Sequence, residues 1–171
     1  GFIDVHVHGV EGFDTLSGGA SVGDIASRMP RFGVTGFCPT TVACAPADVR
    51  AVLEQVRRAR EVPDPLAARV LPAHLESNFI SPEYKGAQPL ECLRLPRGSR
   101  VEDRGSSWGA TEILAEIAAA RPDVGIVTVA PELDGAIELI RELVAHENHV
   151  SLGHSGATYE QAMEGVRAGA R

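Results

Sequence analysis

The 171-residue sequence lacks several features that would each point to a class of protein. It has no run of basic residues and its formal net charge is −7, so nucleic acid is not an expected partner. No apolar stretch approaches the roughly 20 residues that cross a bilayer, so we expect no membrane partner. The three cysteines, Cys38, Cys44 and Cys92, form no CxxC pair, which favours free thiols in a reducing, cytoplasmic setting.

Familiar catalytic motifs are missing as well. The glycines at residues 9–12 and 17–19 match neither a P-loop nor a complete dinucleotide-binding fingerprint. The pattern Gly-x-Ser-x-Gly occurs at residues 19–23 and 105–109, but neither copy directly follows a predicted strand, so the sequence shows no nucleophile elbow of a serine hydrolase. What the chain does have is 44% hydrophobic residues, enough to bury one sizeable core.

Short apolar segments alternate with amphipathic ones along the chain. Strands are predicted at residues 1–8, 33–42, 69–76, 125–130 and 149–154, and helices at 22–32, 46–59, 107–120, 133–146 and 158–168. This alternation implies βα units and a mainly parallel sheet. Residues 77–106 are too many for a simple connection, and long loops of this kind are usually functional or disordered.

Two histidines, His6 and His8, stand two residues apart in the first predicted strand. Side chains repeat every second residue along a strand, so both imidazoles point to one face while Val5 and Val7 face the other. Two imidazoles a few Å apart can hold one divalent cation. The alternative is a pair of surface histidines on an edge strand.

Polar side chains also close the later predicted strands. Glu76 ends the third and His154 the fifth, while His74 shares the face of Glu76. The carboxyl ends of parallel strands collect at one edge of a sheet or barrel, so we expect these groups to meet His6 and His8. A solvated loop Glu and a structural His are the alternatives, and His74 is a candidate for orienting the ligands.

The opening residues 1–9, Gly-Phe-Ile-Asp-Val-His-Val-His-Gly, resemble the first barrel strand of the amidohydrolase superfamily. Within it, the chain resembles the N-acetylglucosamine-6-phosphate deacetylase family. The segments that carry this resemblance are residues 33–40, 74–76, 79–87, 127–132 and 150–158. The resemblance implies an α/β fold, a partial (β/α)8 TIM-type barrel with about five βα units over residues 1–171. The later strands and the family's small β-domain are then absent, and we expect the chain to be part of a longer protein.

The resemblance also implies a metal-dependent hydrolase that removes the acetyl group from N-acetylglucosamine 6-phosphate in amino-sugar catabolism. Glu76 and His154 then bind the main metal, and His6 and His8 belong to a second metal position. One or two divalent ions are implied, with zinc expected and iron, manganese or cobalt as alternatives.

The same resemblance indicates which residues contact the substrate and where the catalytic acid or base lies. Ala87 and Gln88 are implied to contact the sugar. The catalytic acid or base is expected beyond residue 171, so the chain by itself is not expected to be a competent deacetylase.

Two positions depart from the family pattern. The family usually follows the metal-binding Glu with Gly-Pro, where this chain has Ser77-Asn78, and it tends to place a His where this chain has Gln88. An amidohydrolase acting on another N-acyl or cyclic amide substrate is therefore an alternative. A second alternative is an inactive half-barrel that binds metal or self-associates, because open sheet edges favour pairing into a homo-oligomer.

Overall fold

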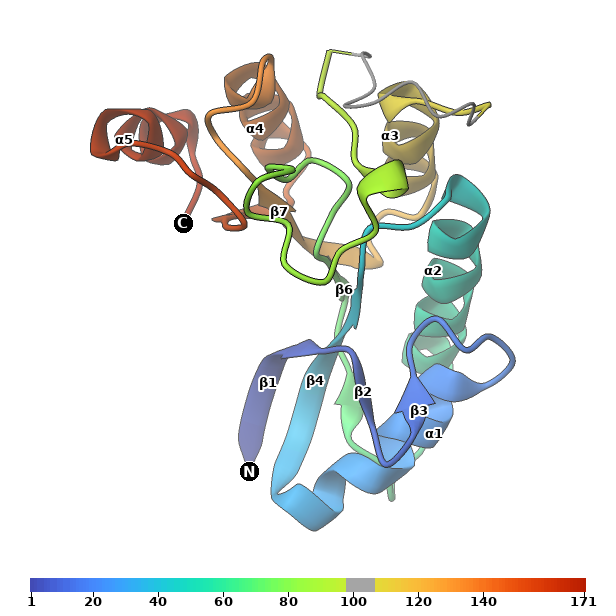
Figure 1. The fold of residues 1–171 in the computed structure, drawn as a ribbon. Coiled ribbons are helices and arrows are strands. Elements are labelled where there is room, and N and C mark those ends of the chain that lie inside the picture. The colour runs from blue at the N-terminus through green and yellow to red at the C-terminus, as the bar shows by residue number, and fades with distance from the viewer. Residues whose placement is uncertain (98–106) are drawn as a thin grey trace.

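A computed structural model describes residues 1–97 and 107–171 of the chain (Figure 1). The strands are β1 (Phe2–Val7), β2 (Gly9–Val10), β3 (Phe13–Asp14), β4 (Val34–Thr41), β5 (Arg69–Val70), β6 (Ala73–Leu75), β7 (Val124–Val129) and β8 (His149–Leu152). The α-helices are α1 (Ser21–Arg28), α2 (Pro46–Glu61), α3 (Ala110–Ala119), α4 (Ala136–Ala145) and α5 (Tyr159–Ala168), with 3-10 helices η1 (Met29–Phe32) and η2 (Leu90–Cys92).

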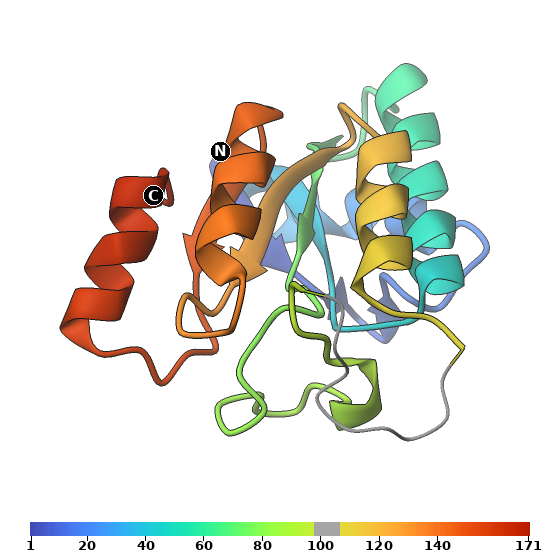
Figure 2. The same ribbon diagram turned by 90° about the horizontal axis from the view of Figure 1, so that it is seen from above.

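The main sheet is six-stranded and parallel, in the order β1-β4-β6-β7-β8, with β5 also paired to β4. Strand β4 is its most enclosed member, since residues 36–41 are all buried. Parallel strands covered by helices are expected to be largely apolar, and β4 departs from this near its carboxyl end, where Thr40 and Thr41 are buried. The predicted α/β architecture with a parallel sheet is confirmed, and the sheet curls as it runs from β1 to β8 (Figures 1 and 2).

Helices lie along the outer side of the sheet, and α2 and α4 each bury one apolar stripe. In α2 the buried residues include Val49, Val52, Leu53 and Val56, and in α4 they are Ala136, Leu139, Ile140 and Leu143. Both sets follow the i, i+3, i+4, i+7 spacing of one helical face. Figure 2 shows α2, α3, α4 and α5 following one another around the sheet in chain order. The core lies between these helices and the strands.

Several predicted boundaries differ from the structure. The strand predicted at 69–76 is divided into β5 and β6, because Pro72 between them has no N–H to donate to a ladder. The helix predicted at 22–32 ends as α-helix at Arg28 and continues as η1, which contains Pro30. Residues 107–109 precede α3 without being helical, and part of the predicted long loop, residues 98–106, lies outside the described residues.

The antiparallel hairpin β2–β3 was not predicted from the sequence. It begins at Gly9, directly after His8, where the backbone passes so close to residue 13 that a Cβ would lie 2.2 Å from its carbonyl oxygen. Each of these two strands has only two residues, too few for an alternating pattern to be recognised. The hairpin turns the chain away immediately after the histidine pair.

The parallel register brings the carboxyl ends of β1, β4, β6, β7 and β8 to one edge of the sheet (Figure 1). Residues 77–97, which follow β6, lie over this edge. Among the described helices, none combines the length and the hydropathy needed to cross a bilayer.

Candidate metal centre

His6 and His8 lie where β1 ends, and their side chains are about one-third to two-fifths exposed. Their Nε2 atoms are 3.0 Å apart, and the rings meet edge to face with centroids 4.8 Å apart. The strand alternation therefore places both imidazoles on one face, as predicted.

Glu76 follows β6 directly and is buried, with its carboxylate turned toward the histidines. Its Oε2 lies 3.1 Å from His8 Nε2, and its Oε1 lies 2.7 Å from His154 Nε2 and 3.8 Å from His6 Nε2. The ligand atoms of His6, His8 and Glu76 all lie within 4.8 Å of one another. The structure thus brings together all four residues that the sequence suggested as metal ligands.

The protonation of two imidazoles follows from what their other nitrogen contacts. His8 Nδ1 lies 3.2 Å from the carbonyl oxygen of Thr40, and His154 Nδ1 lies 2.8 Å from that of Tyr84. A carbonyl oxygen only accepts, so both Nδ1 atoms carry the proton. In the neutral rings the Nε2 lone pairs then face the oxygens of Glu76, and acceptors directed at one another need a cation between them.

In the absence of a metal, the pKa values of His8 and Glu76 shift toward a protonated imidazole beside a carboxylate. The hydrogen bond with Glu76 raises the pKa of His8 although partial burial opposes the shift. Burial raises the pKa of Glu76, but hydrogen bonds from His8 and His154 outweigh it and lower that pKa to about 2. Neutral imidazole nitrogens and a carboxylate are also a usual donor set for zinc and related divalent ions. The residues present therefore fit a divalent metal.

His74 faces the same interior, but both of its ring nitrogens already have hydrogen-bond partners. Its Nδ1 lies 2.9 Å from the Val5 carbonyl oxygen and its Nε2 lies 2.8 Å from Thr128 Oγ1. Burial lowers its pKa, so the ring stays neutral with Nδ1 donating to Val5. It ties β1 to β6 and β7 beside His6, whose ring it meets edge to face at 4.9 Å.

Ala87 and Gln88 lie in the loop that passes beside His154. Ala87 is exposed, whereas Gln88 is 4% exposed and both ends of its amide are bonded. Its Nε2 donates to Glu76 Oε2 at 2.5 Å, and its Oε1 accepts from the backbone N–H of Ala43 at 2.6 Å. Gln88 therefore links the carboxylate to the loop after β4, a contact that sequence spacing did not suggest.

Ser77 and Asn78, which replace the family's usual Gly-Pro, are both buried, and both side chains are hydrogen-bonded to the backbone. The hydroxyl of Ser77 donates to the Thr128 carbonyl and accepts from the N–H of Phe79. The Asn78 amide donates to the carbonyls of Cys44 and Cys92, each at 2.8 Å. These side chains brace the loop that follows Glu76, and no sequence motif signalled them.

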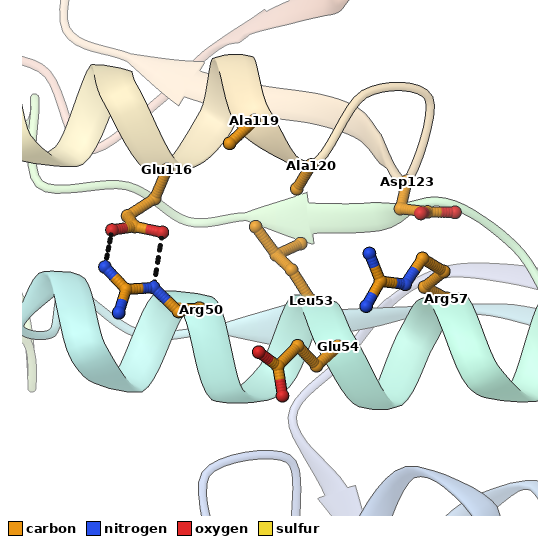
Figure 3. A pocket seen from close by; sticks show the side chains of 8 residues that line it. All are labelled: Arg50, Leu53, Glu54, Arg57, Glu116, Ala119, Ala120 and Asp123. Atoms are coloured by element: carbon orange, nitrogen blue, oxygen red, sulfur yellow. Dashed lines mark hydrogen bonds and ion pairs between the residues drawn. The ribbon is translucent and has the colours of Figure 1, made fainter.

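A separate cavity of about 200 Å³ lies between α2 and α3, in the outer helical layer (Figure 3). Arg50 spans its mouth and pairs with Glu116 through two hydrogen bonds, which lower the pKa of that carboxyl. Leu53 points into the cavity beside Ala119 and Ala120. None of the residues around Glu76 lines it, so it is no part of the candidate metal centre.

No protein-family model matches the chain. The N-acetylglucosamine-6-phosphate deacetylase of Vibrio furnissii is 36% identical over 176 residues, and that of Rattus norvegicus is 40% identical over 174. These alignments cover 100% and 99% of this chain but 40% of each relative. An N-acetylgalactosamine-6-phosphate deacetylase of Escherichia coli O157:H7 is 33% identical, over 99% of this chain and 42% of its own length.

Solved structures point the same way. The deacetylase of Thermotoga maritima superposes with a TM-score of 0.78 at 31% identity, covering 99% of this chain and 41% of that one. A variant of the Mycobacterium smegmatis enzyme, in complex with N-acetyl-D-glucosamine-6-phosphate, superposes with a TM-score of 0.78 at 28% identity, covering 99% and 40%. The resemblance expected from the motifs is confirmed, and the chain spans about two-fifths of the relatives' length.

Proposed function

We propose that this chain is the metal-binding part of an N-acetylglucosamine-6-phosphate deacetylase, a hydrolase of an amide bond. This proposal rests on one observation: the Nε2 atoms of His8 and His154 both approach the Glu76 carboxylate, while their Nδ1 atoms are hydrogen-bonded to backbone carbonyls. Curated relatives with this activity match it from end to end. The domain assignment follows: residues 1–171 form about five βα units of a (β/α)8 barrel of the metal-dependent amidohydrolase kind.

Glu76 and His154 are assigned to the main metal, and His6 and His8 to a second position. A divalent ion held there, zinc first among the candidates, lowers the pKa of a bound water and polarises the amide carbonyl. The chain's own contribution is to present the lone pairs, fix the His8 and His154 rings through their Nδ1–H groups, and hold the Glu76 carboxylate between them. The proton carrier to the leaving amine is assigned to a residue outside these 171.

The loop of Ala87 and Gln88 is assigned to the sugar. Its position supports this, because a Cβ at the neighbouring Gly86 would lie 3.6 Å from the His154 ring. The exposed Ala87 backbone is the part of the loop open to a ligand. Since the Gln88 amide is engaged with Glu76, a sugar hydroxyl reaching it has to share or displace that bond.

Elemental analysis of the purified chain tests the metal assignment. Zinc at one or two equivalents is expected for the parent, with a large loss in His6→Ala, Glu76→Ala and His154→Ala. His146→Ala is the matched control, because among the described residues that ring is hydrogen-bonded only to the carbonyl of Glu142 in α4, the helix that His146 caps. A parent that takes up no zinc, or variants that keep it, would refute the assignment.

A chimera tests the activity. This chain replaces the matching segment of the Vibrio furnissii enzyme, which supplies the remaining three-fifths, and acetate release from N-acetylglucosamine 6-phosphate is measured. Turnover that disappears with Glu76→Ala supports the proposal. A folded, zinc-loaded chimera without turnover would refute it.

The alternative of a different N-acyl substrate is favoured by the Escherichia coli O157:H7 relative, which is named an N-acetylgalactosamine-6-phosphate deacetylase. Assaying the same chimera with N-acetylgalactosamine 6-phosphate, and with other N-acyl and cyclic amides, ranks the candidates by kcat/KM. A preference for any of them over the glucosamine compound would move the assignment to that substrate.

Self-association is favoured by the apolar edge strand. Phe2, Ile3 and Val5 on β1 are each more than half exposed, and among the described strands β1 pairs only with β4. An exposed apolar edge is a template for pairing, so we assign the isolated chain to a homo-oligomer. Light scattering that shows a compact monomer would refute this.

The three free cysteines support a cytoplasmic location.

A further inference from the structure

The backbone of His154 has a conformation that needs support from its surroundings. Its φ is +49°, in the left-handed region that residues with a side chain seldom adopt. Such conformations persist where neighbouring contacts over-determine them, and they gather at functional sites. The contacts on either side of His154 therefore decide where its imidazole points.

On one side the loop after β6 holds the residue. The N–H of Ser81 donates to the His154 carbonyl at 2.9 Å, and the Tyr84 carbonyl accepts from the ring at 2.8 Å. Gly156 packs so closely on Tyr84 that a Cβ there would lie 2.3 Å from its ring. These contacts are made mainly by the backbone.

On the other side a single carboxylate holds the next three residues. Glu132, which follows β7, accepts from the Ser155 hydroxyl at 2.6 Å and from the Gly156 N–H at 2.7 Å. The Ser155 oxygen in turn accepts from the N–H of Ala157 at 2.9 Å. All residues from 155 to 157 are thus attached, directly or through one hydroxyl, to Glu132.

We propose that Glu132 is a positioning residue for the His154 imidazole. In the part of the chain that the structure describes, Glu132 forms no hydrogen bond with Glu76 or with the His154 ring, and it acts by fixing the backbone that follows His154. The inference rests on the metal site proposed above. Removing a group that orients a metal ligand typically weakens metal affinity about 10- to 100-fold.

The test compares Co²⁺ binding to the parent chain with binding to Glu132→Ala and Glu132→Gln. Glu164→Ala is the control, an exposed Glu on α5 in the same part of the molecule. We expect Glu132→Ala to weaken Co²⁺ affinity about 10-fold or more and to change the visible absorption of the bound ion. Glu132→Gln should recover part of both, because its carbonyl still accepts from Gly156. Glu164→Ala should match the parent.

A folded Glu132→Ala with the parent's affinity and spectrum would overturn the inference. If that variant does not fold, Glu132→Gln and Ser155→Ala decide in the same assay, with weaker binding expected for each. Amide hydrogen exchange of the metal-free chain separates this inference from the proposed function. A parent that binds no Co²⁺ refutes the metal site, whereas unchanged protection of Gly156 and Ser81 in Glu132→Ala refutes the role of Glu132.

Discussion

Replacing Asn78 by Ala tests whether the loop after Glu76 depends on the residue that stands where relatives usually have Pro. Asn78 is 3% exposed, and its amide donates at 2.8 Å to the carbonyls of Cys44 and Cys92. The two carbonyls come from loops that are far apart in the sequence. The substitution removes both hydrogen bonds and leaves the carbonyls without that donor.

A net contribution of about 1 kcal/mol for each bond gives an expected destabilisation of about 2 kcal/mol, and up to about 3 if water does not reach the carbonyls. Urea unfolding followed by circular dichroism measures it. Asn148→Ala is the matched control, because its amide makes one such bond, to the Val124 carbonyl at 2.8 Å, and its Oδ1 has no hydrogen-bond partner. We expect the control to lose at most about 1 kcal/mol.

The result that would refute this reasoning is a loss below about 0.5 kcal/mol, the range of ordinary surface substitutions. A loss no larger than that of Asn148→Ala would refute it equally, since the argument depends on two bonds against one. A changed denaturant slope would instead show that the compactness of one of the two states had changed.

Three further predictions concern the same region. In the metal-free chain, the lowered pKa of Glu76 stabilises the fold fully above about pH 4.5, and this contribution is lost as the pH falls toward 2. The raised pKa of His8 stabilises the fold fully below pH 6.5, and this contribution is lost as the pH rises above that value. Thermal unfolding with a chelator should therefore show greatest stability between these limits, and a profile that Glu76→Gln leaves unchanged would contradict the assignment. Gln88→Glu places a second carboxylate beside Glu76, so we expect a lower metal-free Tm and a larger rise on adding zinc than in the parent; equal values would contradict this. Arg94→Met removes a buried guanidinium that donates to two backbone carbonyls at 2.7 Å and stacks on Trp108. We expect the free energy of unfolding measured in urea to fall by about 3 kcal/mol or more, and a fall of less than about 1 kcal/mol would contradict this.

Features that depend on local spacing were predictable from the sequence. The His6 and His8 pair shares a face because strand side chains alternate, and α5 follows its N-cap Thr158, which forms a capping box with Gln161. The stripes of α2 and α4 repeat with the helical period. Two of the boundaries that moved did so at Pro30 and Pro72, whose effect on a helix or a ladder depends on the pairing around them.

The partners of buried polar groups were not predictable. Gln88 was expected to face the sugar, and the structure bonds its amide to Glu76 and Ala43. Asn78 was known only as a departure from a family pattern, and its two acceptors lie 34 and 14 residues away along the chain. Such contacts depend on which loops the fold brings together, which no periodicity records.

The sequence by itself determined the α/β alternation, the parallel order of the strand ends, and the set of residues able to bind a metal. Tertiary structure alone decided that His8 and His154 turn their Nε2 atoms onto opposite oxygens of Glu76, because backbone carbonyls of Thr40 and Tyr84 hold their other nitrogens. The physical reason is one of range. Secondary structure follows from side-chain period over neighbouring residues, whereas a ligand site depends on directional bonds that form only after distant loops have packed.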